Sequence, residues 1–188
     1  MSSGASVHSV QFYDSHTALM DRLCALVSAG LLVGDSVLIV ATEEHREQLV
    51  AALYELKVDV LDYAWASRII MCDAEELLAE FMVEGLPDAE LFRTAIGDLV
   101  KESGRSDGGE ERGVVIFGEM VAVLWSEGNR VAALALEHLW NNLLAEQTLN
   151  LNCAYPRTLF AGDEAGVLTI CQSHSHVVGV PAHPTTVN

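Results

Sequence analysis

The chain has 188 residues, and its 27 Asp and Glu side chains outnumber 10 Lys and Arg, giving a formal net charge of −17. Hydrophobic residues make up 51% of the sequence, more than disordered chains contain, so we expect a folded domain of conventional size. Phosphates require clustered cations, and this chain has only two lysines, Lys57 and Lys101. Nucleic acid is therefore excluded as a partner of the bulk surface.

The apolar stretches do not predict a membrane span. Residues 23–41 form the longest stretch, but Gly30 and Asp35 interrupt it, and a second stretch, residues 114–125, contains Glu119. A spanning helix needs about 20 predominantly apolar residues, and charges inside it are costly. We expect both stretches to be buried elements of a domain that has no membrane contact.

The N-terminal residues and the spacing of the cysteines predict a reducing compartment. Residues 1–7 are polar and lack the basic start of a secretory signal. The four cysteines are widely spaced and form no C-x-x-C pair, so we expect reduced thiols; they are Cys24, Cys72, Cys153 and Cys171. These features predict a cytoplasmic protein.

Strand and helix patterns alternate along the chain, which predicts an α/β fold with a mostly parallel central sheet and helices on both faces. Strands are predicted at residues 7–13, 36–41, 68–72, 114–117, 149–155 and 167–171, with a weaker alternation at residues 58–63. The expected arrangement has three layers.

Helices are predicted between these strands, each beginning at a capping residue. Asp14 or Ser15 caps the first helix, which Gly30 is expected to stop, and Thr42 caps the second. Further helices are expected from Asp73 to Gly85, from Pro87-Asp88 to residue 100, from Glu119 to Gly128, and over residues 130–147, with Asn129 as a turn or cap residue. Residues 101–113 are predicted as an exposed loop, residues 1–178 as one domain, and residues 179–188 as a flexible tail.

The common catalytic motifs of α/β folds are missing. Neither lysine follows a glycine, so G-x-x-x-x-G-K-[ST] is absent, and the dinucleotide fingerprint G-x-G-x-x-G is absent too. The G-x-S-x-G pattern occurs only at residues 104–108, inside the polar, Gly-rich stretch and not at the strand-to-helix turn of a nucleophile elbow, and H-E-x-x-H is absent. These absences argue against an enzyme.

One ordered set of motifs is present. In chain order it comprises His8-Ser9-Val10-Gln11-Phe12-Tyr13-Asp14; Val40-Ala41-Thr42 and His45-Arg46; Phe81-Met82-Val83, Gly85 and Pro87-Asp88; Phe117-Gly118-Glu119-Met120-Val121, Leu124-Trp125 and Gly128-Asn129; Leu136-Glu137 and Leu139-Trp140-Asn141; Cys153-Ala154-Tyr155-Pro156; and His174-Ser175-His176-Val177. Over residues 7–178 this set resembles the MEDS domain, the methanogen/methylotroph sensory domain of the dichloromethane-responsive regulator.

The resemblance implies a RecA/KaiC-like fold that has lost its phosphate loop. Residues 13–16 would then occupy the strand-to-helix turn where that loop lies in an active ATPase. Glu119 would follow the strand that carries the metal-binding acid of such an enzyme.

The resemblance also implies a sensory role in signal transduction and transcription regulation, with a small and largely apolar organic molecule as the ligand. Family members are usually fused to kinase, transcription-factor or anti-sigma-type modules. This chain leaves no room for such a module, so we expect a separate partner, a histidine kinase or an anti-sigma-type regulator. Self-association into a homodimer stays open.

Ligands of open parallel sheets bind beyond the carboxyl ends of the strands, which selects the candidate site. The set combines aromatic surface with a few polar groups, as small-molecule pockets do. It comprises Phe12, Tyr13, Asp14, Thr42, His45, Glu119, Cys153, Tyr155, His174 and His176. For Phe12 and Tyr13 the alternative is plain core packing, and for Asp14 it is a helix cap.

Individual side chains leave alternatives open. Glu119 lies between apolar runs, and a buried unpaired carboxylate is costly, so it should pair with Arg46 or a histidine, bond a loop amide, or hold a ligand. Trp125 and Trp140 lie on helical patterns and are expected in the core.

A thiolate and imidazole site is a further alternative, formed by Cys153, Cys171, His174 and His176. The spacing C-x-x-H-x-H is unusual for zinc, and alternate histidines on an extended segment point to opposite faces. We therefore predict no metal ligands, and any cofactor is unknown. A thiol or histidine switch, a divergent metal or thiol enzyme, and a protein-interaction module with a vestigial pocket are the competing interpretations.

Overall fold

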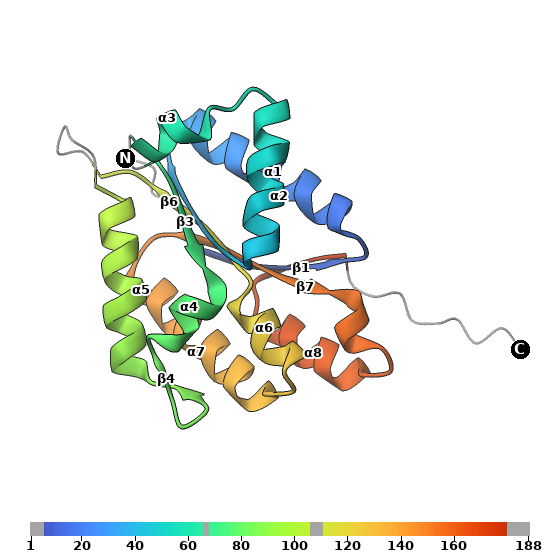
Figure 1. Cartoon of the computed structure of the whole chain (residues 1–188). Helices are drawn as coiled ribbons and strands as arrows, with labels where there is room; N and C mark the ends of the chain where they lie inside the picture. Colours follow the sequence, from blue (N-terminus) through green and yellow to red (C-terminus); the bar gives the residue numbers. More distant parts are fainter. Residues whose placement is uncertain (1–5, 66–67, 106–110, 180–188) are drawn as a thin grey trace, which may run out of the picture.

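The computed structural model describes residues 6–65, 68–105 and 111–179, and it has three layers (Figure 1). Within these residues, six strands form one sheet in the order β3-β2-β6-β7-β1-β8, and all neighbours are parallel. The strands are β1 (Val7–Tyr13), β2 (Ser36–Ala41), β3 (Ile69–Asp73), β6 (Val114–Gly118), β7 (Asn150–Pro156) and β8 (His176–Val178). The predicted α/β class with a parallel central sheet is confirmed.

Helices cover both faces of the sheet (Figure 1). One face packs against α1 (His16–Val33), α2 (Glu43–Glu55) and α3 (Val60–Trp65). The other face packs against α4 (Ala74–Ala79), α5 (Ala89–Ser103), α6 (Met120–Ser126), α7 (Arg130–Glu146) and α8 (Glu164–Gln172). The hairpin of β4 (Met82–Val83) and β5 (Leu86–Pro87) and the short helix η1 (Arg157–Phe160) complete the fold.

The sheet separates two apolar cores, because successive side chains of a strand point to opposite faces. On β1, Val10 and Phe12 belong to the core under α6, α7 and α8, whereas Tyr13 packs against the core under α1 and α2. Trp125 and Trp140 lie in the former core, as expected. Residues that are neighbours in the sequence of a strand therefore belong to different sites.

Helix α1 is long and apolar enough to cross a membrane by length and composition alone. Its side chains Leu19, Leu23 and Val27 are, however, almost completely buried against the sheet, which makes α1 a helix of the domain core.

The sequence predicted that the first helix stops at Gly30, and this prediction is wrong. The helix continues to Val33 and ends at Gly34, whose φ of 96° is the left-handed conformation that glycine adopts at a helix end. Gly30 is buried instead, and a Cβ there would lie 2.9 Å from a methyl group of Val37. Glycine at position 30 thus permits α1 to lie close to β2.

Two predicted strands are wrong. Residues 58–63 fall largely in α3, and residues 167–171 lie within α8, whose first turn is capped by the Asp163 carboxylate bonding the backbone N–H of Gly166. Short apolar runs fit a strand and a buried helix equally well, so the capping aspartate would have been the better signal.

The helix predicted from Asp73 to Gly85 is also shorter in the structure. Helix α4 ends at Ala79, and the chain continues into the β4–β5 hairpin, where Gly85 has a φ of 82°. Helix α5 extends to Ser103, so the start of the predicted loop at 101–113 is helical. Residues 106–110 of that loop and residues 180–188 of the predicted tail lie outside the described residues.

Candidate functional site

A polar network lies at the carboxyl edge of the sheet, where Glu119 follows β6. Its side chain is nearly buried, and its Oε1 accepts a hydrogen bond of 2.6 Å from Nδ1 of His45 on α2. Its Oε2 accepts a 3.1 Å hydrogen bond from the backbone N–H of Thr42. Glu119 is therefore held by a histidine and a loop amide, two of the partners that the sequence left open.

The network continues to the surface. His45 Nε2 lies 3.0 Å from Nδ1 of His16, an exposed residue in the first turn of α1, and the ring of Tyr13 meets that of His45 edge-on at 6.4 Å. The hydrogen bond with Glu119 raises the pKa of His45, and burial together with the Glu119 charge raises the pKa of Tyr13. We name this set the edge network: Tyr13, His16, Thr42, His45 and Glu119.

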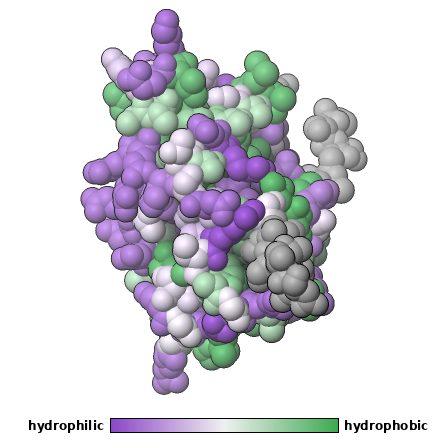
Figure 2. Space-filling view, turned by 90° about the vertical axis from the view of Figure 1, so that its right-hand side faces the viewer, coloured by the Kyte–Doolittle hydropathy of each residue, from purple (hydrophilic) through white to green (hydrophobic). Residues whose placement is uncertain are grey.

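The cations near this edge bind other partners. Arg46 pairs with Asp73 at 2.7 Å rather than with Glu119, and Arg157 lies 3.3 Å from Asp14. Asp14 is exposed and does not cap α1, because the Ser15 hydroxyl accepts the capping bond from Ala18. Figure 2 views the side on which β1 and β7 end in Figure 1, and hydrophilic side chains cover most of the middle of this face.

Four of the other predicted site residues lie on the opposite face of the sheet: Phe12, Cys153, Tyr155 and His174. Phe12 and Tyr155 are buried and pack with Phe160 and Trp125 in one aromatic group. The structure thus brings Tyr13, Thr42, His45 and Glu119 together. Cys153 and His174 belong to a second cluster, whose Glu137 accepts a hydrogen bond from Tyr155.

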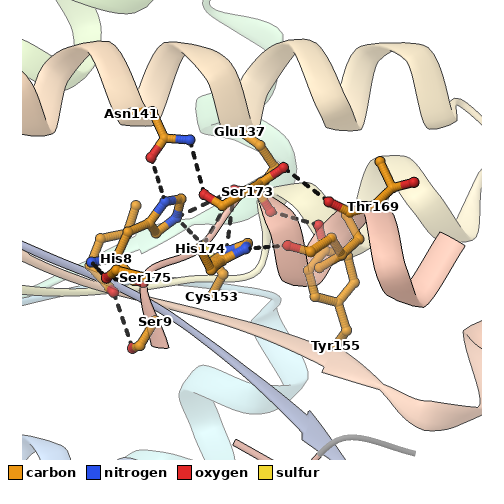
Figure 3. Close-up of polar contacts among 12 residues, drawn as sticks. His8, Ser9, Glu137, Asn141, Cys153, Tyr155, Thr169, Ser173, His174 and Ser175 are labelled. Atoms are coloured by element: carbon orange, nitrogen blue, oxygen red, sulfur yellow. Dashed lines mark hydrogen bonds and ion pairs between the residues drawn. The ribbon is translucent and has the colours of Figure 1, made fainter. Parts of the chain in front are cut away.

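This second cluster lies between the sheet, at strands β1 and β7, and helix α7 (Figure 3). One donor atom from each of four residues lies within 4.8 Å of the others. The four residues come from β1, α7, β7 and the connection between α8 and β8; they are His8, Glu137, Cys153 and His174. We name them the buried cluster.

Three members of the buried cluster, His8, His174 and Glu137, are fixed by hydrogen bonds to residues outside it (Figure 3). His8 Nδ1 lies 2.9 Å from Oδ1 of Asn141, and His174 Nδ1 donates to the carbonyl of Ile170 at 2.7 Å. The Tyr155 hydroxyl donates to Glu137 Oε1 at 2.8 Å. These contacts orient the remaining atoms, Nε2 of both rings and Oε2 of Glu137, toward one another.

Burial shifts the pKa values of several side chains in and beside this cluster. Burial and the neighbouring Glu137 charge raise the pKa values of Cys153 and Tyr155 well above their usual ranges, and burial lowers the pKa of His174. The Cys153 thiol is therefore protonated in this surrounding and is no activated nucleophile.

Two members of the buried cluster escaped the sequence prediction, and two predicted residues lie elsewhere. His176 is exposed on β8, and Cys171 lies on α8 outside the group of four. His8 and Glu137 take their places. A signal existed for both: His8 shares a strand face with Val10 and Phe12, and Glu137 lies between Leu136 and Trp140 on the buried side of α7.

Open hollows occur away from both sites. One of about 400 Å³ lies between α1 and the sheet beside Arg22 and Phe117. Another of about 640 Å³ lies beside the end of α2 and α3, where Val50, Tyr54 and Leu61 are exposed.

Comparisons with known proteins agree with this description. The sequence model of the MEDS family (MEthanogen/methylotroph, DcmR Sensory domain) matches residues 7–175. A crystal structure of a KaiC-like protein from the hyperthermophilic archaeon Pyrococcus horikoshii OT3 superposes with a TM-score of 0.54 at 16% sequence identity. The alignment covers 79% of this chain and 62% of that protein, and it shows a shared fold. Curated proteins gave no significant match.

Proposed function

Because the chain belongs to the MEDS family of sensory domains, we propose that it senses a small, weakly polar organic molecule at the edge network. The observation that carries this proposal is the hydrogen-bonded chain from buried Glu119 through His45 to exposed His16. It lies beyond the carboxyl ends of parallel strands, where α/β folds bind their ligands.

The chemistry of the edge network disfavours a nucleotide. A phosphate site needs free backbone amides and a cation, but the amide of Thr42 already bonds a carboxylate, and Arg46 is paired with Asp73. Glu119 adds a negative charge that acts on Tyr13, in the turn where the resemblance places the lost phosphate loop. A neutral molecule that accepts or donates one hydrogen bond and contacts the ring of Tyr13 suits these groups better.

We propose that ligand binding changes the relative positions of two helices, α1 and α2. His16 begins α1, His45 lies in the first turn of α2, and the two helices pack against each other. A ligand that inserts between these rings and binds one arrangement better than the other would shift their relative positions. We propose that a separate cytoplasmic signalling protein, a histidine kinase or an anti-sigma-type regulator, responds to that shift and thereby links the domain to transcription regulation. In this proposal the domain is not an enzyme.

A thermal-shift screen tests the proposal. Short alcohols, aldehydes and halogenated methanes would be compared with ATP and Mg²⁺ on the full chain. We expect a concentration-dependent rise in Tm with at least one organic class and none with ATP, because only ligands that bind the folded state stabilise it. Stabilisation by ATP with Mg²⁺ alone would contradict the proposal.

Matched tyrosine variants locate the site. Tyr13→Ala should abolish the rise in Tm, whereas Tyr54→Ala, at an exposed tyrosine of α2, should preserve it. The reverse result would assign the ligand to the hollow beside α2 and α3 and would refute the edge network as the binding site.

A further inference from the structure

We propose that the buried cluster is a binding site for one divalent transition-metal ion, Zn²⁺ by preference, with four ligands: His8, Glu137, Cys153 and His174. The sequence argument against a metal applied to Cys171 and His176, which lie outside the cluster. The structure substitutes a carboxylate and an imidazole for them, and the objection from spacing no longer applies.

Four of the six distances between the donor atoms are close to the edges of a tetrahedron, and all six are within 4.8 Å. From Glu137 Oε2, His8 Nε2 lies at 3.3 Å, His174 Nε2 at 3.4 Å and Cys153 Sγ at 3.9 Å. His8 Nε2 lies 3.4 Å from Cys153 Sγ. Zinc bonds of about 2.0–2.3 Å give tetrahedral edges of about 3.3–3.8 Å, so small side-chain shifts suffice for coordination.

The hydrogen bonds around the cluster determine which nitrogen of each ring carries the proton. Asn141 Nδ2 donates to the carbonyl of Ser173 at 3.0 Å, so the amide must present Oδ1 to His8, whose Nδ1 is then the donor. His174 Nδ1 likewise donates to a backbone carbonyl. In the neutral rings, both Nε2 atoms therefore present lone pairs to the lone pairs of Glu137 Oε2.

That arrangement is poorly satisfied without a cation. The His174 side chain is fully buried, and its Nε2 makes no hydrogen bond within the described residues. Buried polar atoms are nearly always bonded, and an orphaned one requires an explanation. A metal ion at the centre would accept all the converging lone pairs at once.

The donor set also balances charge. Two neutral imidazoles, one carboxylate and one thiolate sum to −2, which a divalent ion neutralises inside the core. Binding would release the Cys153 thiol proton to solvent, as coordination to zinc does. Asn141, the Ile170 carbonyl and Tyr155 would act as positioning groups, because metal-bound histidines and carboxylates are oriented by such partners.

A bound ion would join four separate elements: β1, α7, β7 and the connection from α8 to β8. The edge strand β8 has three residues, and its attachment to β1 would gain most from this link.

Cobalt substitution tests the proposal on the full chain. Metal-free protein, prepared with a chelator, would be titrated with Co²⁺ and then with Zn²⁺. We expect stoichiometric binding, a near-ultraviolet charge-transfer band from a cobalt–thiolate bond, intense visible bands typical of tetrahedral cobalt, and their loss on adding Zn²⁺.

Variants distinguish ligands from bystanders. Cys153→Ser should remove the charge-transfer band, and Asn141→Ala, which keeps all four ligands, should weaken Co²⁺ binding by about 10- to 100-fold. Cys171→Ser and His176→Ala, the matched controls, should leave the spectrum and the affinity unchanged.

Clear outcomes would overturn the proposal. Absence of stoichiometric Co²⁺ binding by the folded wild-type chain would show that the cluster is a hydrogen-bonded network only. Loss of the band in Cys171→Ser, or its persistence in folded Cys153→Ser, would assign the metal elsewhere. Because Asn141→Ala retains every ligand, it tests the site even if Cys153→Ser fails to fold.

Discussion

The edge network and the buried cluster both combine one buried glutamate with two histidines, yet they differ in how protons are distributed. In the edge network, Nδ1 of His45 points at the carboxylate and Nε2 points at the second ring, so donors and acceptors can alternate along the chain. In the buried cluster, both Nδ1 atoms are occupied by outer partners, and lone pairs converge.

The difference shows that the outer hydrogen bond of a histidine determines what its inner nitrogen can do. A ring whose Nδ1 is free to donate to a carboxylate belongs to a proton network that reaches solvent at His16. A ring whose Nδ1 donates to a carbonyl or an amide oxygen offers a lone pair suited to a cation. The same residue types therefore support two chemistries in one small domain.

The largest expected effect is the loss of the Glu119 carboxylate. Glu119→Ala should lower the free energy of unfolding by about 3–5 kcal/mol, because it leaves the His45 ring and the Thr42 amide without their buried acceptor. Urea unfolding followed by circular dichroism measures it. Glu47→Ala, at an exposed glutamate of α2, should stay within about 0.5 kcal/mol. A loss below 1 kcal/mol for Glu119→Ala would mean that the edge network contributes little to folding.

An intermediate effect is expected in the buried cluster. In metal-free protein, Tyr155→Phe should lower the free energy of unfolding by about 1–3 kcal/mol, because the buried Glu137 Oε1 loses its hydroxyl donor. The same unfolding assay applies, and Tyr54→Phe at an exposed position is the matched control. Equal stability of Tyr155→Phe and wild type would argue that the Glu137 side chain reorients and that the arrangement in Figure 3 is not rigid.

The sheet and the edge network were largely predictable, because they depend on local patterns. Continuous apolar runs identified β2 and β6, and an acid between two apolar segments identified Glu119 as a residue that needs a partner. The partner itself was one of several open choices. Choosing His45 over Arg46 requires the direction of α2 relative to β6, which no local pattern contains.

The buried cluster was only half predictable, because its residues are far apart in the sequence. His8 and Cys153 lie 145 residues apart and meet only through the parallel pairing of β1 with β7. The argument used for Glu119 would also have applied to Glu137, an acid on the apolar side of a helix, and it would have revealed the missing ligand. Residues 167–171 were predicted as a strand but lie in α8, because a short apolar run is compatible with a strand and with a buried helix.

The smallest expected effect at any one pH comes from titration of His45. Its pKa is raised by the hydrogen bond to Glu119, so the native state holds this proton more tightly than the unfolded chain does. The stabilisation is therefore complete below the unfolded histidine pKa of about 6.5 and is lost as the pH rises through the folded value, with a slope of at most about 1.4 kcal/mol per pH unit. Tyr13, His16 and Glu44 also face this ring and contribute to its charge balance.

His45→Asn separates this titration from the rest of the molecule, because an amide can still donate to Glu119 but does not gain or lose a proton near neutral pH. The free energy of unfolding, measured by urea denaturation from pH 5.5 to 8.5, should decline more steeply with pH in wild type than in His45→Asn. His138→Asn on α7 provides the matched histidine control and should keep the wild-type slope. If wild type and His45→Asn share one slope, the proton does not reside on His45, and the contrast drawn between the edge network and the buried cluster would lose its basis.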